Sequence, residues 1–229
     1  MQLSEAEAAG KSTALPRPMS LAGGVYESIF AQLMSLEIAP GARITVDNLV
    51  KKLNVSQTPI REALGRLEGE GLVTRTHLVG YHAAPQITKK QFEELYELRL
   101  LLEPDTVANS ARLISDAQLA DLRALARVMA EIGGNEETLR YSNFARKDAD
   151  FHDRILGISG NNLIRETLRV QHTHFRIFRL MYHWRVTAEA LDEHEAILDA
   201  LAGRNPEAAR LAMQTHIERS KIRLMPAFD

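Results

Sequence analysis

Apolar residues recur at helical spacing in two short runs between positions 46 and 67, and a tight turn separates the runs. The first run contains Val46, Leu49, Val50 and Leu53, and the second contains Ile60, Ala63, Leu64 and Leu67. Asn54 can leave the first helix in a left-handed turn, and Ser56 or Thr58 can cap the second. Pro59 suits the first turn of a helix, and Gly71 ends it. The pattern predicts a helix-turn-helix, whose second helix fits the major groove of DNA.

The pattern changes to short strands after the second helix. Residues 72–74 predict one strand, Gly80 predicts a turn, and residues 81–83 predict the return strand. A short β-hairpin behind a helix-turn-helix is a wing, so this part of the chain is expected to form a winged helix-turn-helix.

The remaining periodicity is helical. One helix is predicted before the motif, over residues 24–36, and Pro85 marks a boundary after the wing. Further helices are predicted over residues 90–113, 116–132, 136–158, 162–182, 187–201 and 206–225. The predicted fold is mainly α: a flexible arm over residues 1–20, a winged helix-turn-helix with a small β wing over 21–85, and an all-α helical bundle over 86–229.

Composition narrows the class of protein. The 229 residues contain no cysteine, no apolar run long enough to span a membrane and no signal peptide at the N-terminus. These features predict a cytoplasmic protein that has no membrane partner. The net charge is −2, so any basic surface for nucleic acid must be local. The basic residues that can form it are Lys51, Lys52, Arg61, Arg66 and Arg75.

Polar residues interrupt the apolar stripes of the predicted bundle. Asp148 and His152 are four residues apart and share one helix face, while His194 and His216 each lie on the apolar stripe of a later helix. Burying these groups without partners is costly. A divalent metal ion resolves the cost, because imidazole and carboxylate suit zinc, nickel, manganese or iron. The alternative is that each histidine is a hydrogen-bonded core residue.

Arg99 repeats this pattern between Leu95 and Leu102. A buried guanidinium requires an anion. The anion can be Glu103 on the same helix, a carboxylate across the bundle, or a bound ligand. Other polar residues that can line a cavity, or serve as caps and solvated faces, are Asn161, Asn162, His172, His174 and Arg176.

The helix-turn-helix resembles the GntR family of bacterial transcription regulators. The residues that match its signature are Val55, Ser56, Thr58, Pro59, Arg61, Glu62, Ala63 and Leu64, and residues 70–73 match the start of its wing. The resemblance implies DNA contacts from Ser56, Gln57, Thr58 and Arg61, phosphate contacts from Lys51, Lys52 and Arg66, and minor-groove contacts from the wing tip near His77 and Gly80. Many members have arginine at the position of Gln57, and some have a basic residue at that of Asp47. Glutamine favours adenine edges and arginine favours guanine edges. The operator is therefore expected to differ from the best-known DNA sites of the family.

The bundle resembles the FCD effector domain of the FadR-type branch of that family. Asp148, Phe151 and His152 match its aspartate-x-x-phenylalanine-histidine motif, and residues 193–197 and 215–217 match its two later histidine segments. The resemblance implies a metal site formed by Asp148, His152, His194 and His216, with zinc as the first choice. It also places Arg99 in the ligand cavity. The implied effector is a small carboxylate bound to the metal and to Arg99.

Together these features predict a ligand-responsive transcription regulator, a repressor, that binds a pseudo-palindromic operator in double-stranded DNA as a homodimer. One alternative is a metalloregulator in which the metal is the signal and Arg99 is structural. Another is a metal-dependent hydrolase. Four protein ligands and the lack of a general base at a motif spacing argue against the hydrolase, so the chain is expected not to be an enzyme.

Overall fold

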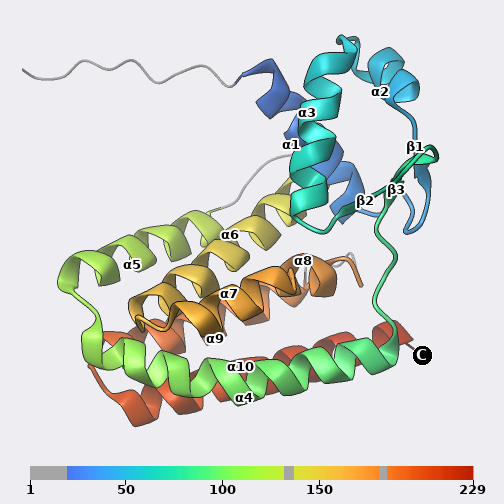
Figure 1. The fold of residues 1–229 in the computed structure, drawn as a ribbon. Coiled ribbons are helices and arrows are strands. Elements are labelled where there is room, and N and C mark those ends of the chain that lie inside the picture. The colour runs from blue at the N-terminus through green and yellow to red at the C-terminus, as the bar shows by residue number, and fades with distance from the viewer. Residues whose placement is uncertain (1–19, 132–136, 181–184, 229) are drawn as a thin grey trace, which may run out of the picture.

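A computed structural model of the chain describes residues 20–131, 137–180 and 185–228, which form two domains (Figure 1). The smaller domain, residues 20–85, is called the reading head here, and the larger, residues 86–228, the helical domain. In Figure 1 the reading head lies at one end of the helical domain, above its long helices. None of the described helices is long and apolar enough to cross a membrane.

The reading head is the predicted winged helix-turn-helix. Its elements are α1 (Leu21–Met34), β1 (Arg43–Ile44), α2 (Val46–Leu53), α3 (Gln57–Gly69), β2 (Val73–Thr76) and β3 (Gly80–Ala83). The helix-turn-helix is α2 and α3, and the wing is β2 and β3. The strand β1 was not predicted: it completes an antiparallel sheet of order β1-β3-β2, with Ile44 opposite Tyr81. Two residues are too few to show an alternating pattern, so only the pairing with β3 defines this strand.

Local signals set the turns of the reading head. Asn54 ends α2 in the left-handed region with φ of 53°, and Gly71 follows α3 with φ of 69°. Both turns are as predicted. Ser56 occupies the N-cap position of α3 but makes no capping hydrogen bond through its side chain, and Thr58 lies inside the helix. The predicted N-cap position of Ser56 is confirmed, but the predicted capping by a side chain is not.

The core of the reading head forms where α1 packs against α3. Its fully buried side chains are Ile29, Phe30 and Leu33 of α1 and Ile60, Leu64 and Leu67 of α3. Each such side chain contributes about 1.5–3 kcal/mol through burial. This contact fixes α3 and leaves its opposite face, including Gln57 and Arg61, exposed to solvent.

The helical domain is an all-α bundle, as predicted. Its elements are α4 (Lys89–Leu113), α5 (Asp116–Ala130), α6 (Glu137–Ile158), α7 (Asn162–Val170), α8 (Thr173–Phe178), α9 (Arg185–Ala202), α10 (Pro206–Leu224) and the short 3₁₀ helix η1 (Met225–Phe228). The long helices α4 and α10 lie side by side along the domain (Figure 1). Thr88 and Ser115 begin α4 and α5 with capping boxes, which satisfy the first free N–H groups of each helix.

One predicted helix is wrong. The helix expected over residues 162–182 is two helices, because the backbone turns left-handed at His172, with φ of 49°. Helical periodicity continues through this turn and gives no sign of it. The His172 side chain lies against Gly71 of the reading head, so a contact between the domains accompanies the break. Ile132, Glu136 and Tyr182, which end or begin predicted helices, lie outside the described residues.

Candidate functional site

The four polar residues predicted to share one interior do share it. Asp148 and His152 lie on α6, His194 on α9 and His216 on α10, and each is at most 4% exposed. One ring nitrogen each of His152, His194 and His216 lies within 4.8 Å of the others. Asp148 Oδ1 lies 3.3 Å from His194 Nε2. We call these four residues the histidine cluster.

The hydrogen bonding of the histidine cluster is incomplete. Among the described residues, His152 Nε2 and His194 Nδ1 are buried without a hydrogen-bond partner, and His194 Nε2 has only its 3.3 Å contact with Asp148 Oδ1, which lacks good hydrogen-bond geometry. Buried polar atoms are nearly always paired, so these nitrogens, gathered in one place, require an explanation. Neutral imidazole nitrogens beside a carboxylate are a donor set that suits zinc and similar divalent ions. These residues therefore fit a metal ion.

Two buried carboxylates next to the histidine cluster each contact the Nδ1 atom of one histidine. Glu103 Oε2 lies 3.3 Å from His152 Nδ1, and Glu193 Oε2 lies 2.9 Å from His216 Nδ1. A carboxylate on one ring nitrogen fixes the imidazole and leaves the other nitrogen for a metal. Sequence reasoning missed both roles. The only signal for Glu193 was its position beside His194, and charged residues next to histidines are common on solvated faces.

His174 of α8 also joins the cluster. Its Nδ1 lies 2.6 Å from Asp148 Oδ2, and its ring centroid lies 4.5 Å from that of His152. The sequence placed His174 only among several polar residues that might line a cavity or cap a helix. Asn161, from the same group, is a cap: its Oδ1 accepts the backbone N–H of Ile164.

Burial sets the charge states of the cluster. It lowers the pKa of His152 to about 3, with His174 as the second cause. It also lowers the pKa of His216 to about 4, although the hydrogen bond with Glu193 opposes it. Burial raises the pKa of Asp148, but His174 and His194 outweigh it and hold that pKa well below its usual range. The cluster thus combines the neutral imidazoles of His152 and His216 with the ionised carboxylate of Asp148, the forms that bind a metal.

Arg99 is fully buried and is already paired. Its Nε donates to Glu103 Oε1 at 2.6 Å and one terminal nitrogen donates to Oε2 at 3.3 Å, while the other terminal nitrogen, NH1, has no partner among the described residues. Glu103 therefore joins Arg99 to His152. Burial raises the pKa of Glu103, but the charge of Arg99 and the contact with His152 outweigh it and lower that pKa. The predicted partner on the same helix is present, and the N–H groups of NH1 remain for another acceptor.

The exposed face of α3 carries a short chain of hydrogen bonds. Gln57 Nε2 donates to Asp47 Oδ1 at 3.1 Å, and Arg61 donates to Gln57 Oε1 at 3.3 Å. The two positions at which this chain departs from the GntR pattern, Asp47 and Gln57, are thus in contact. Arg61 takes this amide partner, and within the described ranges it makes no ion pair with Glu62 or Glu68.

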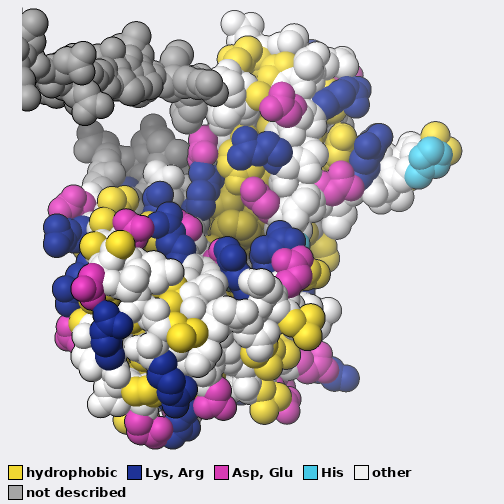
Figure 2. Space-filling view, turned by 60° about the vertical axis from the view of Figure 1, so that its left-hand side comes forward, with side chains coloured by type: hydrophobic (Ala, Val, Ile, Leu, Met, Phe, Trp, Pro, Cys, Tyr) yellow, Lys and Arg dark blue, Asp and Glu magenta, His cyan; other side chains and the backbone are white. Residues whose placement is uncertain are grey.

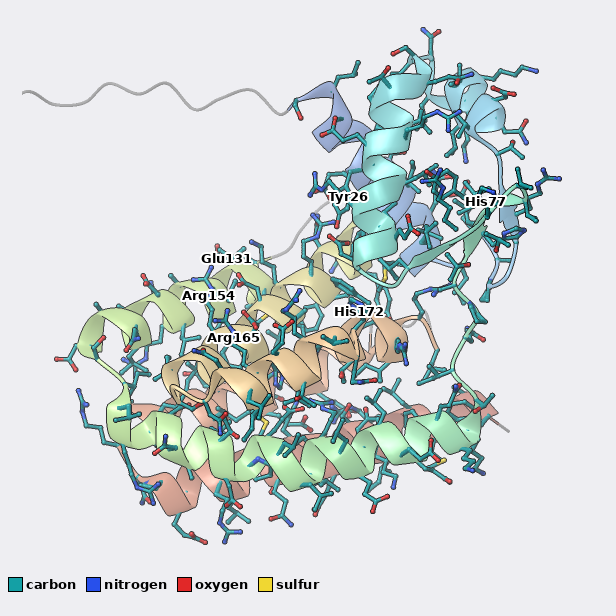
Figure 3. The ribbon with its side chains drawn as sticks, viewed as in Figure 1. Tyr26, His77, Glu131, Arg154, Arg165 and His172 are labelled. Atoms are coloured by element: carbon teal, nitrogen blue, oxygen red, sulfur yellow. The ribbon has the colours of Figure 1, made fainter. Side chains whose placement is uncertain are left out.

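The other predicted DNA contacts divide into two groups. Ser56, Thr58 and Lys51 are exposed near the start of α3, and His77 lies at the far tip of the wing, before Gly80 (Figure 3). Lys52 and Arg66 have other partners. Lys52 bonds Glu37 and Gln32 beside α1, both at 2.7 Å. Arg66 stacks over the Tyr26 ring at 4.0 Å, near the last turn of α3. The structure therefore separates these two from the start of α3.

Direct contacts join the two domains. Arg146 of α6 lies over the Phe30 ring at 4.2 Å and bonds Glu27 at 2.5 Å. Phe175 of α8 meets Phe30 edge to face. Arg179, after α8, donates to the carbonyl of Ala84 in the linker at 2.7 Å. Figure 3 shows Tyr26 and His172 at this junction. Because α8 contacts Asp148 through His174 as well, one short helix lies between the histidine cluster and the reading head.

Comparison with known proteins agrees with this arrangement. The family described as bacterial regulatory proteins, gntR family, matches residues 21–82, and the FCD domain matches residues 94–219. The chain is 31% identical over 186 residues to the Nta operon transcriptional regulator of Aminobacter aminovorans, covering 81% of this chain and 86% of the relative. It is 26% identical over 225 residues to the Exu regulon transcriptional regulator of Escherichia coli (strain K12), covering 87% and 84%.

Solved structures share the fold. E. coli McbR/YncC superposes with a TM-score of 0.66 at 22% identity, covering 92% of this chain and 99% of that one. A putative transcriptional regulator GntR from Rhodococcus sp. RHA1 superposes with a TM-score of 0.67 at 24% identity, covering 92% and 100%. At these identities the likeness concerns the fold alone.

Proposed function

The chain belongs to the gntR family of bacterial regulatory proteins and carries an FCD domain, and from this premise we propose that a divalent metal and a small organic acid control its binding to DNA. It is a DNA-binding transcriptional regulator and not an enzyme. The observation that supports the metal is the set of orphaned, buried imidazole nitrogens beside the Asp148 carboxylate.

The metal would be held by Asp148, His152, His194 and His216. Zinc is the first choice for this donor set, with nickel, manganese or iron as substitutes. When bound, the ion supplies positive charge that attracts a carboxylate. Glu103 and Glu193 fix the rings of His152 and His216 for this purpose.

The carboxylate of the acid would lie between the metal and Arg99. Arg99, Asp148, His174 and His216 line one small cavity, to which Ser220 and Arg223 also contribute. Glu103 takes the Nε N–H and one N–H of NH2, so both N–H groups of NH1 and one of NH2 are left to donate to the acid. We therefore propose that the terminal nitrogens of Arg99 bind the acid through charge-assisted hydrogen bonds.

The proposed reading surface lies at the start of α3 and at the wing tip. Ser56, Gln57, Thr58 and Arg61 would contact base edges, Lys51 a phosphate, and the wing near His77 and Gly80 the minor groove. Two copies would dimerise to bind a pseudo-palindromic operator in the cytoplasm. The acid would act as the signal that releases a repressor, by binding one arrangement of the two reading heads more tightly than the other.

Metal analysis tests the histidine cluster. We expect protein purified without chelator or immobilised nickel to contain about one equivalent of a divalent metal. The double variant His194→Ala, His216→Ala should lose it, because two of the four ligands are gone. A matched variant, His77→Ala, His82→Ala, removes two wing histidines and should retain it. If the wild-type protein is metal-free and still binds DNA, these histidines are core residues and the proposal is contradicted.

A metal-sensing function is the second candidate. It is favoured by the ion pair between Arg99 and Glu103, because this pair gives Arg99 a structural partner without any acid. Exchange of the bound metal separates the two functions. Metal that resists a chelator over hours while acids release DNA supports acid sensing. Metal that exchanges within seconds and itself changes DNA affinity supports metal sensing.

Arg61 offers a test of the reading surface. DNA that the wild-type protein selects from a random pool serves as the operator. We expect Arg61→Ala to weaken its binding by about 1–3 kcal/mol and to relax the preference for one base pair. Arg43→Ala, which removes an exposed arginine from β1, should cost less and leave the preference unchanged. Equal losses in a titration would remove Arg61 from the proposed surface.

A further inference from the structure

A cavity of about 270 Å³ lies between the reading head and the helical domain. Gly69 and Glu70, at the end of α3, form one wall. Residues of α6, α7 and α8 form the other walls, and Glu103, His152 and His174 belong to its lining. Figure 2 shows that apolar and basic side chains meet in the hollow where the two domains come together. The volume lies just below the range of typical small-molecule sites.

The walls of this interdomain cavity are mainly apolar. Leu156 and Leu168 are at most 6% exposed and face it with Phe175 and Ala149. The charged residues at its rim already have partners. Arg165, on α7 (Figure 3), holds Asp153 with its Nε at 2.8 Å, and Arg154 holds Asp150 with two hydrogen bonds of 2.9 Å. The cavity therefore favours a ligand whose body is apolar.

One buried polar atom on the lining lacks a partner among the described residues and is not needed to hold the metal. It is the hydroxyl oxygen of Thr173, a residue 4% exposed. A buried hydroxyl usually bonds to a neighbouring group, and leaving it unpaired costs free energy. His152 and His174 line the same cavity, and His174 contacts Asp148. A ligand in this cavity would thus adjoin both Thr173 and the histidine cluster.

We propose that this cavity binds the body of the effector, which is a small aromatic monocarboxylic acid. Its ring lies against Leu156, Leu168 and Phe175, and its carboxylate lies at the end formed by Thr173 and His152, where the Thr173 hydroxyl donates a hydrogen bond to it. The inference rests on the proposed function for the carboxylate and adds the class of the acid. It also gives the signal a direct route, because a ring in this cavity contacts the end of the recognition helix at Gly69 and Glu70.

Calorimetric titration of the full-length, zinc-loaded protein with benzoate and with acetate tests the proposal. Both acids carry the carboxylate, but only benzoate has a ring to bury. We expect benzoate to bind at least about tenfold more tightly than acetate, through the apolar surface that it buries. Equal affinities would overturn the proposed cavity.

Two variants locate the difference. Ala149→Leu fills the cavity, and we expect it to abolish the advantage of benzoate and leave acetate binding unchanged. The control Ala124→Leu makes the same change on the exposed face of α5 and should alter neither acid. Thr173→Val keeps the shape of the side chain, and we expect it to weaken benzoate about three- to tenfold. An advantage of benzoate over acetate that survives Ala149→Leu would also overturn the cavity.

The same titrations separate this inference from the proposed function. Zinc content, measured for every variant, reports whether the histidine cluster is intact. If acetate and benzoate bind equally and both require zinc, the proposed function stands and the interdomain cavity is wrong. If the zinc-loaded protein binds neither acid, acid sensing fails and the cavity fails with it.

Discussion

The reading head and the helical domain have opposite kinds of interior. Of the buried polar and charged residues in the described part of the chain, Gln32 is the one that belongs to the reading head. The interior of the helical domain contains charged and titratable side chains, which include Arg99, Glu103, Asp148, His152, Glu193, His194 and His216. One domain is held together by apolar packing, and the other contains a network of ionisable groups.

The difference follows from where the binding groups of each domain must lie. DNA is larger than the reading head, so its contacts must lie outside, and the core has only to hold α3 rigid. A small acid can be surrounded, so the acid that we propose as effector would be recognised by buried groups of the helical domain. Buried charges are costly unless they are paired, and a network of this size is weak evidence for stability alone. It is better explained by a ligand that completes it.

Removing one member of the network should have the largest effect. Glu103→Gln leaves the Arg99 guanidinium buried without its counter-ion, and we expect the helical domain to lose about 3–5 kcal/mol of unfolding free energy. The double variant Arg99→Met, Glu103→Leu replaces the pair with apolar side chains and should regain most of that loss. Denaturant unfolding of the metal-free protein measures both.

The same helix supplies the control for this experiment. Lys90 and Glu94 form an exposed pair at the same i,i+4 spacing, 3.8 Å apart. Glu94→Gln should change stability by less than about 0.5 kcal/mol, because water screens the pair. If Glu103→Gln is as stable as Glu94→Gln, breaking the buried ion pair costs no more stability than breaking the exposed one, and the contrast between interior and surface is wrong.

Acid should destabilise the helical domain through its histidines. Burial lowers the pKa of His216 to about 4, below the value of about 6.5 for an unfolded chain, so between these values the unfolded state binds the proton and the folded state does not. Stability is complete above pH 6.5 and falls as the pH drops towards 4. At pH 5 we expect this ring alone to account for a loss of about 2 kcal/mol in metal-free protein. His152, with a pKa of about 3, should add a similar loss over the same range and extend it to lower pH.

Thermal melting at a series of pH values measures this loss. His216→Gln removes one of the two titrating rings and should reduce the loss of stability between pH 6.5 and 4 by about half. His77→Gln changes an exposed histidine at the wing tip and should leave the curve as it is. If the wild type and His216→Gln lose stability in parallel, the carboxylates, and not this ring, set the acid limit.

The two regions also differ in how far their sequences predict them. Contiguous motifs predict the helix-turn-helix and the wing, because Asn54, Pro59 and Gly71 favour particular backbone conformations at their own positions. Polar residues on apolar stripes identify Asp148, His152, His194 and His216. The contact of Glu103 with His152, the roles of Glu193 and His174, the strand β1 and the break at His172 were not predicted. Each depends on contacts between segments far apart in the chain, and the spacing of apolar residues does not predict such contacts.

The contact between the two regions can be tested at Gly71. Its φ of 69° disfavours any side chain, and an added Cβ would overlap the His172 ring of the helical domain. We expect Gly71→Ala to cost the protein about 1–2 kcal/mol. Gly65→Ala, in the middle of α3 with open space around its Cα, should be neutral or stabilise the helix by up to about 1 kcal/mol.

Combining Gly71→Ala with His172→Ala divides this cost into its two causes. His172→Ala removes the ring that the new methyl group would meet, but it leaves the left-handed backbone at position 71 unchanged. The cost of Gly71→Ala in the wild type minus its cost in the His172→Ala background is therefore the part that came from the contact between domains. We expect this part to be the smaller one, because His172 is half-buried and its ring can move aside. Complete recovery would show that the backbone at residue 71 adapts and that the domain contact alone requires glycine.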